Sequence, residues 1–528
     1  MLIIKFNMRN YFLFYILFGS YSLLYSQAKI KCDLIEVSSI AFNKNPTIRS
    51  ANYSIQNAEA DLQVQRSIFD FNLNSDVTFQ NRKYNLFDAD PRNDFVDKTL
   101  RNNSFDFSIG SQKRLRTGQS IDIGLKYNYN NSNFPYNTFN ELVGSFYGNH
   151  SSTLNLVLTQ PLLRGRGAKI VTASEKASVF YINKSKYDYE FANSLEIEQI
   201  GIAYWDYYTA YKSLSIYTQN ENRVREVLNM TTELVKADKK PLSDLDQVNA
   251  DIRNQERLTA VARQNLYNSR INLGRVIGLI DEESQRLDIP VNDFPTVLES
   301  GYNEFIDKNA LIKIAKSKRG DVKAIGEEYK ALELQYLVAT NNLRPQLNLS
   351  AFGFYGSASA GNGVDKSWSS LVNNQGQELG GGAKLSFSFP LNNNLAKGNY
   401  SIRKIALQNQ TVINENIHRN IELNIDIAVN NLMNSVLILQ KSKESFDFYQ
   451  NAFKNEQIKF QSGLTTLLNL ILFQERLTAS ELENLNAQQQ FSNAILILRH
   501  ETGTLISKED LGFKITQNAF YTIPNKEN

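Results

Sequence analysis

The chain has 528 residues, with 57 basic and 54 acidic side chains and a single cysteine. This near balance of charge gives no electrostatic reason to expect nucleic acid as a partner, and a lone Cys32 excludes an internal disulfide framework. Such a length suits several domains or one very elongated domain.

The first 26 residues are expected to be a secretory signal peptide. Lys5 and Arg9 precede an apolar run from Tyr11 to Leu24, and cleavage is expected near Ser26. No later stretch offers the roughly 18 uninterrupted apolar residues of a transmembrane helix. A position in a membrane therefore requires a barrel of β-strands, because only helices and closed barrels satisfy their backbone groups inside lipid.

Six segments alternate apolar and polar residues with the period of two that is typical of a β-strand. Their first apolar residues are Phe71, Phe105, Ile121, Leu154, Leu347 and Leu385. Each segment has roughly the 9 to 11 residues that cross a bilayer as a tilted strand, with an apolar side toward lipid and a polar side toward a wet lumen.

A soluble β-sandwich would show the same alternation. The signal peptide, the 26 tyrosines and 31 phenylalanines, and the long polar loops between strands favour the membrane barrel. The loops are expected to face the outside of the cell and run from Asn81 to Asn103, from Asn130 to His150 and from Gly356 to Glu378.

Two of the strands lead directly into long helices. In LTQPLLRGRG, Pro161 ends a strand because proline cannot continue the ladder of hydrogen bonds, and Gly165 and Gly167 let the chain bend. In FSFPLNNNLAKG, Pro390 repeats this junction. The expected helices, which contain no proline, run from Ala168 to Lys240 and from Asn392 to Gln461. The first would extend about 110 Å at 1.5 Å per residue, so it needs other long helices beside it.

Each long helix is expected to turn and return as a second helix. The first turn lies in KADKKPLSD, where Pro241 can begin the next helix, and the second in KFQSGLTTL, where Gly463 supplies the turn. The returning helices are expected from Leu242 to Gly278 and from Thr466 to Thr502. A heptad-like apolar seam on the second long helix comprises Ile421, Ile425, Ala428, Leu432, Ser435 and Leu439. Two helical hairpins result.

The chain repeats its own organisation. Arg319 follows Asn45 by 274 positions, and Gly503 follows Gly278 by 225. Each half runs in the order helix, strands, long helix, turn and return helix, and the first half carries an extra pair of strands. The expected division is a signal peptide at 1–26, a first repeat at 27–280, a polar linker at 281–308, a second repeat at 309–505 and a C-terminal tail at 506–528.

Several motifs, in this order and spacing, resemble those of the TolC family of outer-membrane efflux channels. They are AFNKNPTIRSANYSIQNAEADL, the QPLL and FPL junctions, RGDVKAI at the start of the second half, and FQSGLTTLLNLI at the second turn. The resemblance, including the duplication, covers essentially everything after the signal peptide.

The resemblance implies an α+β membrane protein, in which internally duplicated protomers of long helical hairpins and transmembrane strands trimerise. The homotrimer would join an outer-membrane β-barrel to a periplasmic α-helical barrel. Its implied function is that of a passive duct in a tripartite efflux pump or a type I secretion system. The implied partners are a periplasmic adaptor (membrane fusion) protein, an inner-membrane pump of the RND, ABC or MFS type and outer-membrane lipid, with no cofactor.

The number of strands departs from the family's usual pattern. Family members usually contribute four strands per protomer, whereas six candidates are present here. The extra pair covers Phe105 to Ile109 and Ile121 to Tyr129. Two alternatives stay open: the pair widens the barrel, or it folds as a separate hairpin.

The closed periplasmic end also departs from the family. The positions that match the family's ring of aspartates are Asn469 and Leu472, so the acidic ring is missing, and Thr465 stands where a basic residue often holds the closed state. Asp244 matches the acidic partner on the first turn. An ion pair between the turns and a merely solvated charged turn both stay open. The neighbouring charged residues are Lys239, Lys240 and Asp246.

The second turn resembles the motif by which the family meets its adaptor. In this interpretation Gly463 makes the tight turn and an exposed Leu464 offers an apolar contact. A purely structural role in the turn is the alternative. The first turn lacks the glycine and has Lys240 and Pro241 instead, so its adaptor contact, expected at Pro241 and Leu242, is less well defined.

Catalysis has little support in the sequence. His150, His418 and His500 are scattered without metal-ligand spacing or a partnered nucleophile, and the glycine-rich stretches are not placed between a strand and a helix as a phosphate site requires. We therefore expect no enzyme, cofactor or metal. The competing class is a non-transport coiled-coil protein with a structural or adhesive role in the cell envelope, which would explain the helices but not the alternating strands.

Overall fold

The computed structural model describes residues 29–134, 147–373, 376–509 and 512–524. The expected signal peptide, residues 1–26, lies outside them. The chain divides into two compact units, which we call the helical unit and the sheet unit. The sheet unit comprises residues 55–185 and 324–415, and the remaining described residues form the helical unit. Each unit therefore takes segments from both halves of the duplicated chain.

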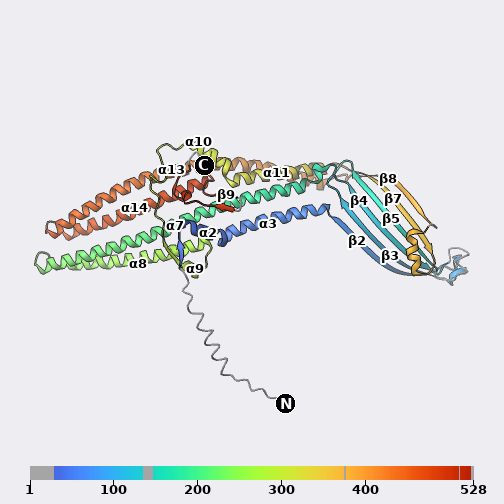
Figure 1. The fold of residues 1–528 in the computed structure, drawn as a ribbon, viewed down its shortest axis with the longest axis horizontal. Helices are drawn as coiled ribbons and strands as arrows, with labels where there is room; N and C mark the ends of the chain where they lie inside the picture. Colours follow the sequence, from blue (N-terminus) through green and yellow to red (C-terminus); the bar gives the residue numbers. More distant parts are fainter. Residues whose placement is uncertain (1–28, 135–146, 374–375, 510–511, 525–528) are drawn as a thin grey trace, which may run out of the picture. The chain divides into compact units, whose positions relative to one another are not determined.

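The sheet unit contains one antiparallel six-stranded sheet, in the order β2-β3-β4-β5-β7-β8 (Figure 1). Its strands are β2 (Phe71–Asn85), β3 (Thr99–Arg114), β4 (Ser120–Ser132), β5 (Tyr147–Pro161), β7 (Gln346–Ala360) and β8 (Glu378–Ser388). The extra pair of segments corresponds to β3 and β4, which are paired between β2 and β5. The extra strands are therefore part of the same sheet and not a separate hairpin.

Five of the six strands are longer than predicted, at 13 to 16 residues, whereas β8 has 11 residues, within the predicted range. Both predicted boundaries of the loop from Asn81 to Asn103 were wrong, and the loop is shorter than predicted. The strands β2 and β3 remain paired as far as Asn85 and Thr99. Backbone hydrogen bonds continue the ladder where both faces have become polar, so the alternating pattern ends before the strand does. Part of the expected loop from Asn130 to His150, residues 135–146, lies outside the described residues.

The register places most of the apolar residues of the six strands on one face, with Val157, Phe352 and Phe354 as exceptions on the other. Leu73 of β2, Ile123 of β4 and Leu156 of β5 belong to one row across the strands. Asn74, Asp122 and Asn155 belong to the opposite face, which is mainly polar. Large apolar side chains that remain exposed on the apolar face in this single chain include Phe71, Leu73, Val77, Phe79, Ile123, Leu154, Leu156, Leu158, Leu385 and Phe387.

Short helices connect the strands. The 3₁₀-helix η1 (Ser67–Phe69) precedes β2, and α4 (Asn93–Val96) lies between β2 and β3. The expected loop from Gly356 to Glu378 was wrong at its beginning, because β7 continues to Ala360. That loop contains a further helix, α12 (Val364–Val372), which packs on β5 and β7.

Four longer helices contribute residues to both units: α3 (Pro46–Arg66), α7 (Ala173–Lys236), α11 (Gly320–Asn342) and α13 (Asn394–Gln461). The helix expected from Ala168 to Lys240 is interrupted at Thr172, where α6 (Ala168–Val171) ends before α7 begins. It also ends earlier than expected, because Asp238 has a positive φ of 55° that an α-helix cannot include. Among the described residues, no helix combines the length and apolar character needed to cross a membrane.

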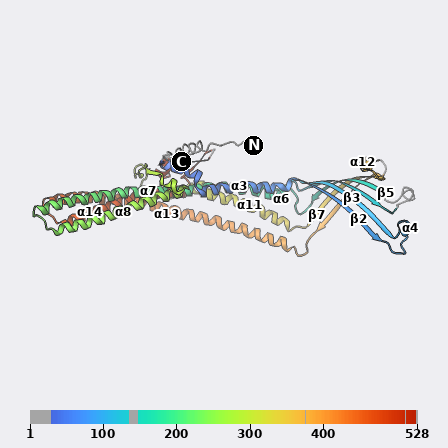
Figure 2. The ribbon, with the colours of Figure 1, turned by 90° about the horizontal axis from the view of Figure 1, so that it is seen from below.

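The helical unit contains the two predicted hairpins (Figure 1, Figure 2). One joins α7 to α8 (Ser243–Ile277), and the other joins α13 to α14 (Leu467–Glu501). Val227, Ile252, Phe460 and Leu470, one from each helix, belong to a single apolar cluster. The predicted seam on α13 is confirmed, since its first five members are buried: Ile421, Ile425, Ala428, Leu432 and Ser435.

Smaller elements complete the helical unit. The segment expected to be a linker contains α9 (Asp281–Gln285) and β6 (Leu287–Pro290), and β6 pairs in parallel with β1 (Ile30–Cys32). Cys32 is fully buried in the apolar cluster around Trp205. The other elements are α2 (Leu34–Lys44), α10 (Lys308–Lys318), β9 (Ser507–Glu509), β10 (Gly512–Lys514) and α15 (Asn518–Tyr521).

The internal duplication is visible in how the helices begin. Asp33 and Asp307, which are 274 positions apart, are the N-caps of α2 and α10, and each carboxylate accepts a hydrogen bond from a backbone amide of the first turn. Both helices have 11 residues. The repeat therefore preserves the positions that start its helices.

The duplication is also visible in how the return helices end. Gly278 and Gly503 follow α8 and α14 with positive φ angles of 84° and 66°. A Cβ atom on Gly278 would lie 2.6 Å from the carbonyl oxygen of Lys44, and one on Gly503 would lie 3.0 Å from the amide nitrogen of Arg319. Only glycine meets both requirements.

Candidate functional site at the turns of the helical hairpins

The second turn, between α13 and α14, is closed by Gly463. Its φ is 75°, its amide donates to the carbonyl of Phe460 at 3.0 Å, and the amide of Leu464 donates to the carbonyl of Lys459 at 2.8 Å. These two bonds form a Schellman motif, which satisfies the last carbonyl groups of the helix. Thr466 then caps α14 by accepting a hydrogen bond from the amide of Asn469 at 3.3 Å.

The first turn, between α7 and α8, has the same backbone geometry without a glycine. Asp238 lies 225 positions before Gly463, and its amide donates to the carbonyl of Val235 at 3.0 Å. The amide of Lys239 donates to the carbonyl of Leu234 at 2.9 Å. Aspartate tolerates the left-handed conformation better than most residues. The residue in the glycine's place is thus Asp238, which the sequence analysis missed although the offset of 225 pointed to it.

Lys240 connects the two turns. Its Nζ donates to the backbone carbonyl of Thr465 at 3.0 Å and lies 5.2 Å from the centroid of the Phe460 ring. Asp244 and Asp246 belong to the first turn of α8, where negative charge favours the helix dipole. Within the described part of the chain, neither aspartate takes part in an ion pair. In one protomer, the turns are therefore joined by a lysine–carbonyl hydrogen bond.

Thr465 is the centre of a small polar cluster inside the second turn. Its hydroxyl donates to the carboxylate of Glu456, which is buried, and Lys459 Nζ lies 3.2 Å from the same carboxylate. Asn469 Nδ2 donates to Thr465 Oγ1 at 3.4 Å. The hydrogen bond from Thr465, and then the one from Lys459, hold the pKa of Glu456 below its ordinary value.

Replacing Thr465 by valine is expected to loosen the second turn, because Glu456 would lose a hydrogen bond while its carboxylate stays buried. A loss of about 1–3 kcal/mol of local stability follows. Faster amide hydrogen exchange in residues 456–466 measures it. The lowered pKa adds a pH dependence, since its stabilisation is complete above about pH 4.3 and is lost as the pH falls through the folded-state pKa. Unchanged exchange in Thr465→Val would contradict this role.

Large apolar side chains project from both turns. Leu242 follows the first turn and Leu464 lies in the second, where 78% of its surface is exposed. Leu468 and Leu472 lie four residues apart on one side of α14, close to the turn, and both are exposed. A single protomer leaves this apolar surface without a partner among its described residues.

Comparisons with protein-family models and with curated proteins found no match. Among solved structures, the outer-membrane channel OprN matches at 14% identity and a TM-score of 0.65, covering 89% of this chain and 90% of its own. The Campylobacter jejuni outer-membrane channel CmeC matches at 14% identity and a TM-score of 0.62, and the match covers 89% of this chain and 85% of CmeC. The outer-membrane protein VceC from Vibrio cholerae matches at 14% identity and a TM-score of 0.62, and the match covers 89% of this chain and 96% of VceC. The chain has the TolC-family fold.

Both strand-to-helix junctions of this chain lie in the sheet unit. Pro161 is the last residue of β5 and is still paired with Asn348, while Pro390 follows the end of β8. Gly165 and Gly167 have φ angles of 79° and 89°, so the bend between strand and helix uses conformations that favour glycine.

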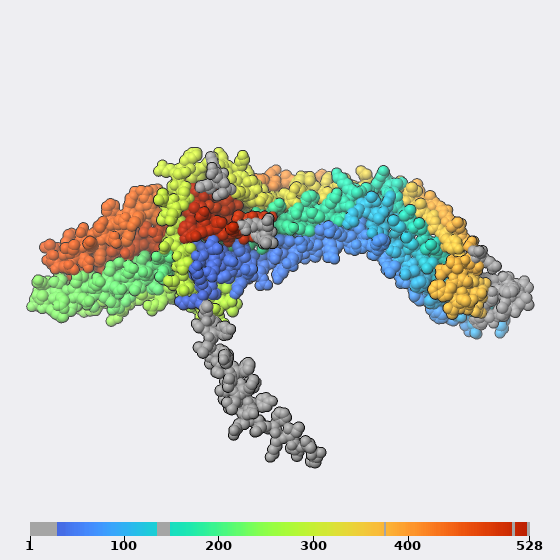
Figure 3. All heavy atoms as spheres, viewed as in Figure 1, coloured from blue at the N-terminus to red at the C-terminus, as the bar shows by residue number. Residues whose placement is uncertain are grey.

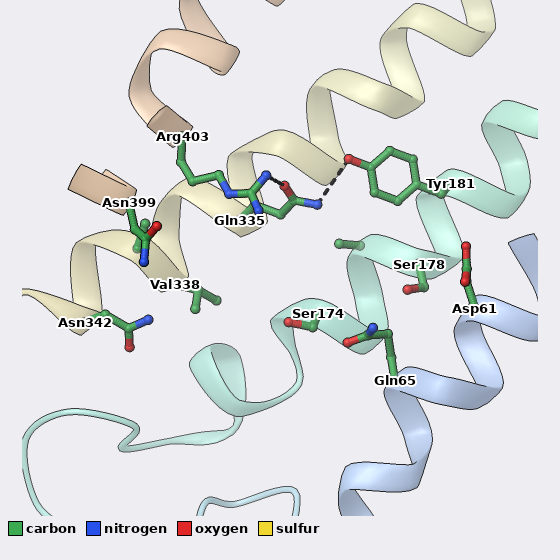
Figure 4. Close-up of a pocket in the computed structure, with 12 residues that line it drawn as sticks. Asp61, Gln65, Ser174, Ser178, Tyr181, Gln335, Val338, Asn342, Asn399 and Arg403 are labelled. Carbon is green, nitrogen blue, oxygen red and sulfur yellow. Dashed lines mark hydrogen bonds between the residues drawn. The ribbon is translucent and has the colours of Figure 1, made fainter. Parts of the chain in front are cut away.

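The helices of the sheet unit line an open, mainly polar pocket of about 560 Å³ between α3, α7, α11 and α13 (Figure 4). Arg403 donates to Gln335 Oε1 at 2.7 Å, and Gln335 Nε2 donates to the hydroxyl of Tyr181 at 3.1 Å. Asp61 and Gln65 approach from α3. Most of the lining residues are polar, and they form no catalytic arrangement. No group of three or more metal-ligating side chains occurs in the described residues.

Proposed function

We propose that this chain is the outer-membrane channel of a tripartite efflux pump or a type I secretion system, and that it is not an enzyme. It acts as a passive duct for substrates delivered by an inner-membrane transporter of the RND, ABC or MFS type through a periplasmic adaptor protein. The observation that carries this proposal is the TolC-family fold, to which the solved outer-membrane channels are similar over 89% of the chain.

The two faces of the sheet support a position in the outer membrane. The apolar face suits contact with lipid, and the polar face suits a water-filled lumen. Aromatic residues occur on the apolar face at both ends of the strands, as in the girdles of membrane barrels. They are Phe71 and Phe387 at the ends joined to the long helices, and Phe79, Phe105, Tyr127 and Tyr129 toward the opposite ends.

The two edges of the sheet support a homotrimer. Within the described chain, β2 and β8 each have only one neighbouring strand. Six strands are fewer than the roughly eight with which single-chain barrels begin, and an unpaired edge cannot face lipid. The sheet therefore needs further copies of the chain. In the proposed homotrimer three copies close one barrel, with β8 of one protomer pairing with β2 of the next.

The turns of the hairpins form the periplasmic end of the duct in this proposal. The aperture is formed by Lys239, Lys240, Asp244, Asp246, Thr465, Asn469 and Leu472. The adaptor contacts Pro241, Leu242, Gly463 and Leu464. The exposure of Leu242 and Leu464 supports this assignment, because an exposed apolar side chain at a tight turn suits insertion against a partner's helices.

Single-channel conductance of the purified protein in a planar bilayer, with the mass in detergent measured on the same sample, tests the proposal. A trimeric mass with a steady conductance supports it. A monomer without conductance contradicts it and leaves a structural or adhesive coiled-coil protein of the cell envelope. The apolar face of the sheet favours the channel, since such a scaffold has no need of membrane strands.

The missing acidic ring predicts that the channel discriminates weakly between cations and anions. Asn469→Asp would place three carboxylates at the aperture of the trimer and is expected to raise the preference for cations. Reversal potentials under a KCl gradient measure this change, and Asn469→Ser, which alters the same position without adding charge, is the control. Strong cation selectivity in the native channel that disappears in Asn469→Ser would contradict the prediction.

A further inference from the structure

Helix α12 lies on the apolar face of the sheet, at the ends of the strands away from the long helices. It packs on β5 and β7, and its atoms stand in front of those strands in Figure 3. The strand residues beneath it are polar although they continue the apolar rows of the face. They are His150, Ser152, Ser357 and Ser359, and all four are buried.

The serines of α12 bind this polar patch through side-chain hydrogen bonds. Ser367 Oγ lies 2.9 Å from the hydroxyl of Tyr127 and 3.3 Å from His150 Nδ1. Ser370 Oγ lies 2.8 Å from Ser152 Oγ, and Ser369 Oγ donates to Ser359 Oγ at 2.9 Å. The polar side of the helix is therefore satisfied by the sheet.

The other side of α12 is exposed and carries three large apolar side chains, with the exposed Asp365 beside them in the first turn. Val364, Trp368 and Val372 recur every four residues, and 79%, 72% and 76% of their surfaces are exposed. This spacing places the three side chains along one stripe of the helix. A short helix with a satisfied polar side and an exposed stripe that contains tryptophan is typical of the boundary between lipid headgroups and acyl chains.

The helix restores an apolar surface where the sheet lacks one. Leu154 and Leu125 lie one row below Ser152 and Tyr127 and begin the aliphatic part of the face. Above that row, bare strands would present histidine and serine side chains to lipid, and unsatisfied polar groups in hydrocarbon are costly. With α12 in place, the apolar surface continues over the patch through Trp368 and its neighbours.

We propose that α12 is a membrane-interface helix that inserts Val364, Trp368 and Val372 among the acyl chains of the outer leaflet, at the level of the headgroup boundary. This inference rests on the proposed function, in which the sheet spans the outer membrane. A second copy of the chain is a poorer occupant, because in the proposed trimer copies join at the edges of the sheet, β2 and β8, whereas α12 packs on β5 and β7.

Tryptophan fluorescence tests the insertion, because the chain contains only two tryptophans. Trp205 is fully buried, so the difference between the native trimer and Trp368→Phe reports on Trp368. The trimer is reconstituted in vesicles whose phospholipids carry bromine at shallow or deep acyl positions, or in unlabelled vesicles with iodide on both sides. The expected result is strong quenching of Trp368 by shallow bromine, weaker quenching by deep bromine, and little quenching by iodide.

Two results would overturn the inference. Quenching by iodide without quenching by bromine would put Trp368 in water, available to an extracellular partner. Protection of Trp368 from both quenchers would put it against another copy of the chain.

A control separates failure of the α12 inference from failure of the channel proposal. Leu156→Trp, made in the Trp368→Phe background, places a probe on the aliphatic part of the face. If deep bromine quenches Trp at position 156 but no bromine quenches Trp368, the membrane sheet stands and only the role of α12 fails.

Discussion

Replacing both Ile402 and Ile405 of α13 by glutamate is expected to leave a monomer that conducts no ions. The two side chains are 61% and 62% exposed in a single protomer. Leu395 and Val412 extend them into a stripe with intervals of seven, three and seven, the spacing of a coiled-coil seam. In the proposed trimer this stripe packs on the neighbouring protomer, and burying charge there without a partner is costly. Mass in detergent and bilayer conductance, measured together, check the result.

The control for this pair is Lys404→Glu. Lys404 lies on the side of the same helix away from the stripe. The substitution therefore introduces the same acidic side chain outside the seam. It is expected to remain a conducting trimer. If the double variant also forms a trimer with native conductance, the stripe on α13 is not a protomer interface.

Replacing Arg319 by leucine is expected to lower the free energy of unfolding more than Thr465→Val or Lys308→Leu does. Arg319 is 7% exposed, and its guanidinium donates to Asp321 at 2.8 Å and to the carboxylate of Glu501. Leucine would leave two partly buried carboxylates without their cation. The expected cost is about 3 kcal/mol, at the lower end of the cost of breaking a buried ion pair. The same position joins α10 to α11 and packs against Gly503, so the loss affects the connection between these helices.

Denaturant unfolding at one fixed protein concentration measures this loss, because the stability of an oligomer depends on concentration. Lys308→Leu is the matched control, since Lys308 also pairs with an acid, Asp426, but both side chains are largely exposed. Its expected cost is about 0–1 kcal/mol. Equal effects of the two substitutions would show that burial of Arg319 does not control the strength of its ion pairs.

The candidate site was predictable from the sequence only in part. Gly463 was identified as the turn residue, because a glycine between two helical segments is a strong local signal. The equivalent role of Asp238 was missed, since aspartate adopts a positive φ only where the surrounding turn requires it. The contact of Lys240 with the carbonyl of Thr465 joins residues 225 positions apart, and no local pattern indicates such a contact.

Local patterns in the sequence predict the six strands of the sheet, the two helical hairpins and the duplication of the chain. Apolar and polar residues alternate with a period of two in the strands, and apolar stripes run along the helices. Proline and glycine mark the ends of these elements. Each signal arises within a few residues of the chain. The N-cap pair Asp33 and Asp307 and the glycine pair Gly278 and Gly503 show that the repeat offsets correspond to equivalent positions in the fold.

The order of the strands, the lengths of their ladders and the position of α12 depend on contacts between distant segments, which no local pattern indicates. The extra pair, β3 and β4, joined the sheet because pairing on both edges satisfies more backbone groups than a separate hairpin can. The loop after β7 contained no strand signal, and its serines bind the sheet through hydrogen bonds to residues as far apart as Tyr127 and Ser359. Such contacts depend on which strands become neighbours, and this is a property of the assembled sheet rather than of any segment.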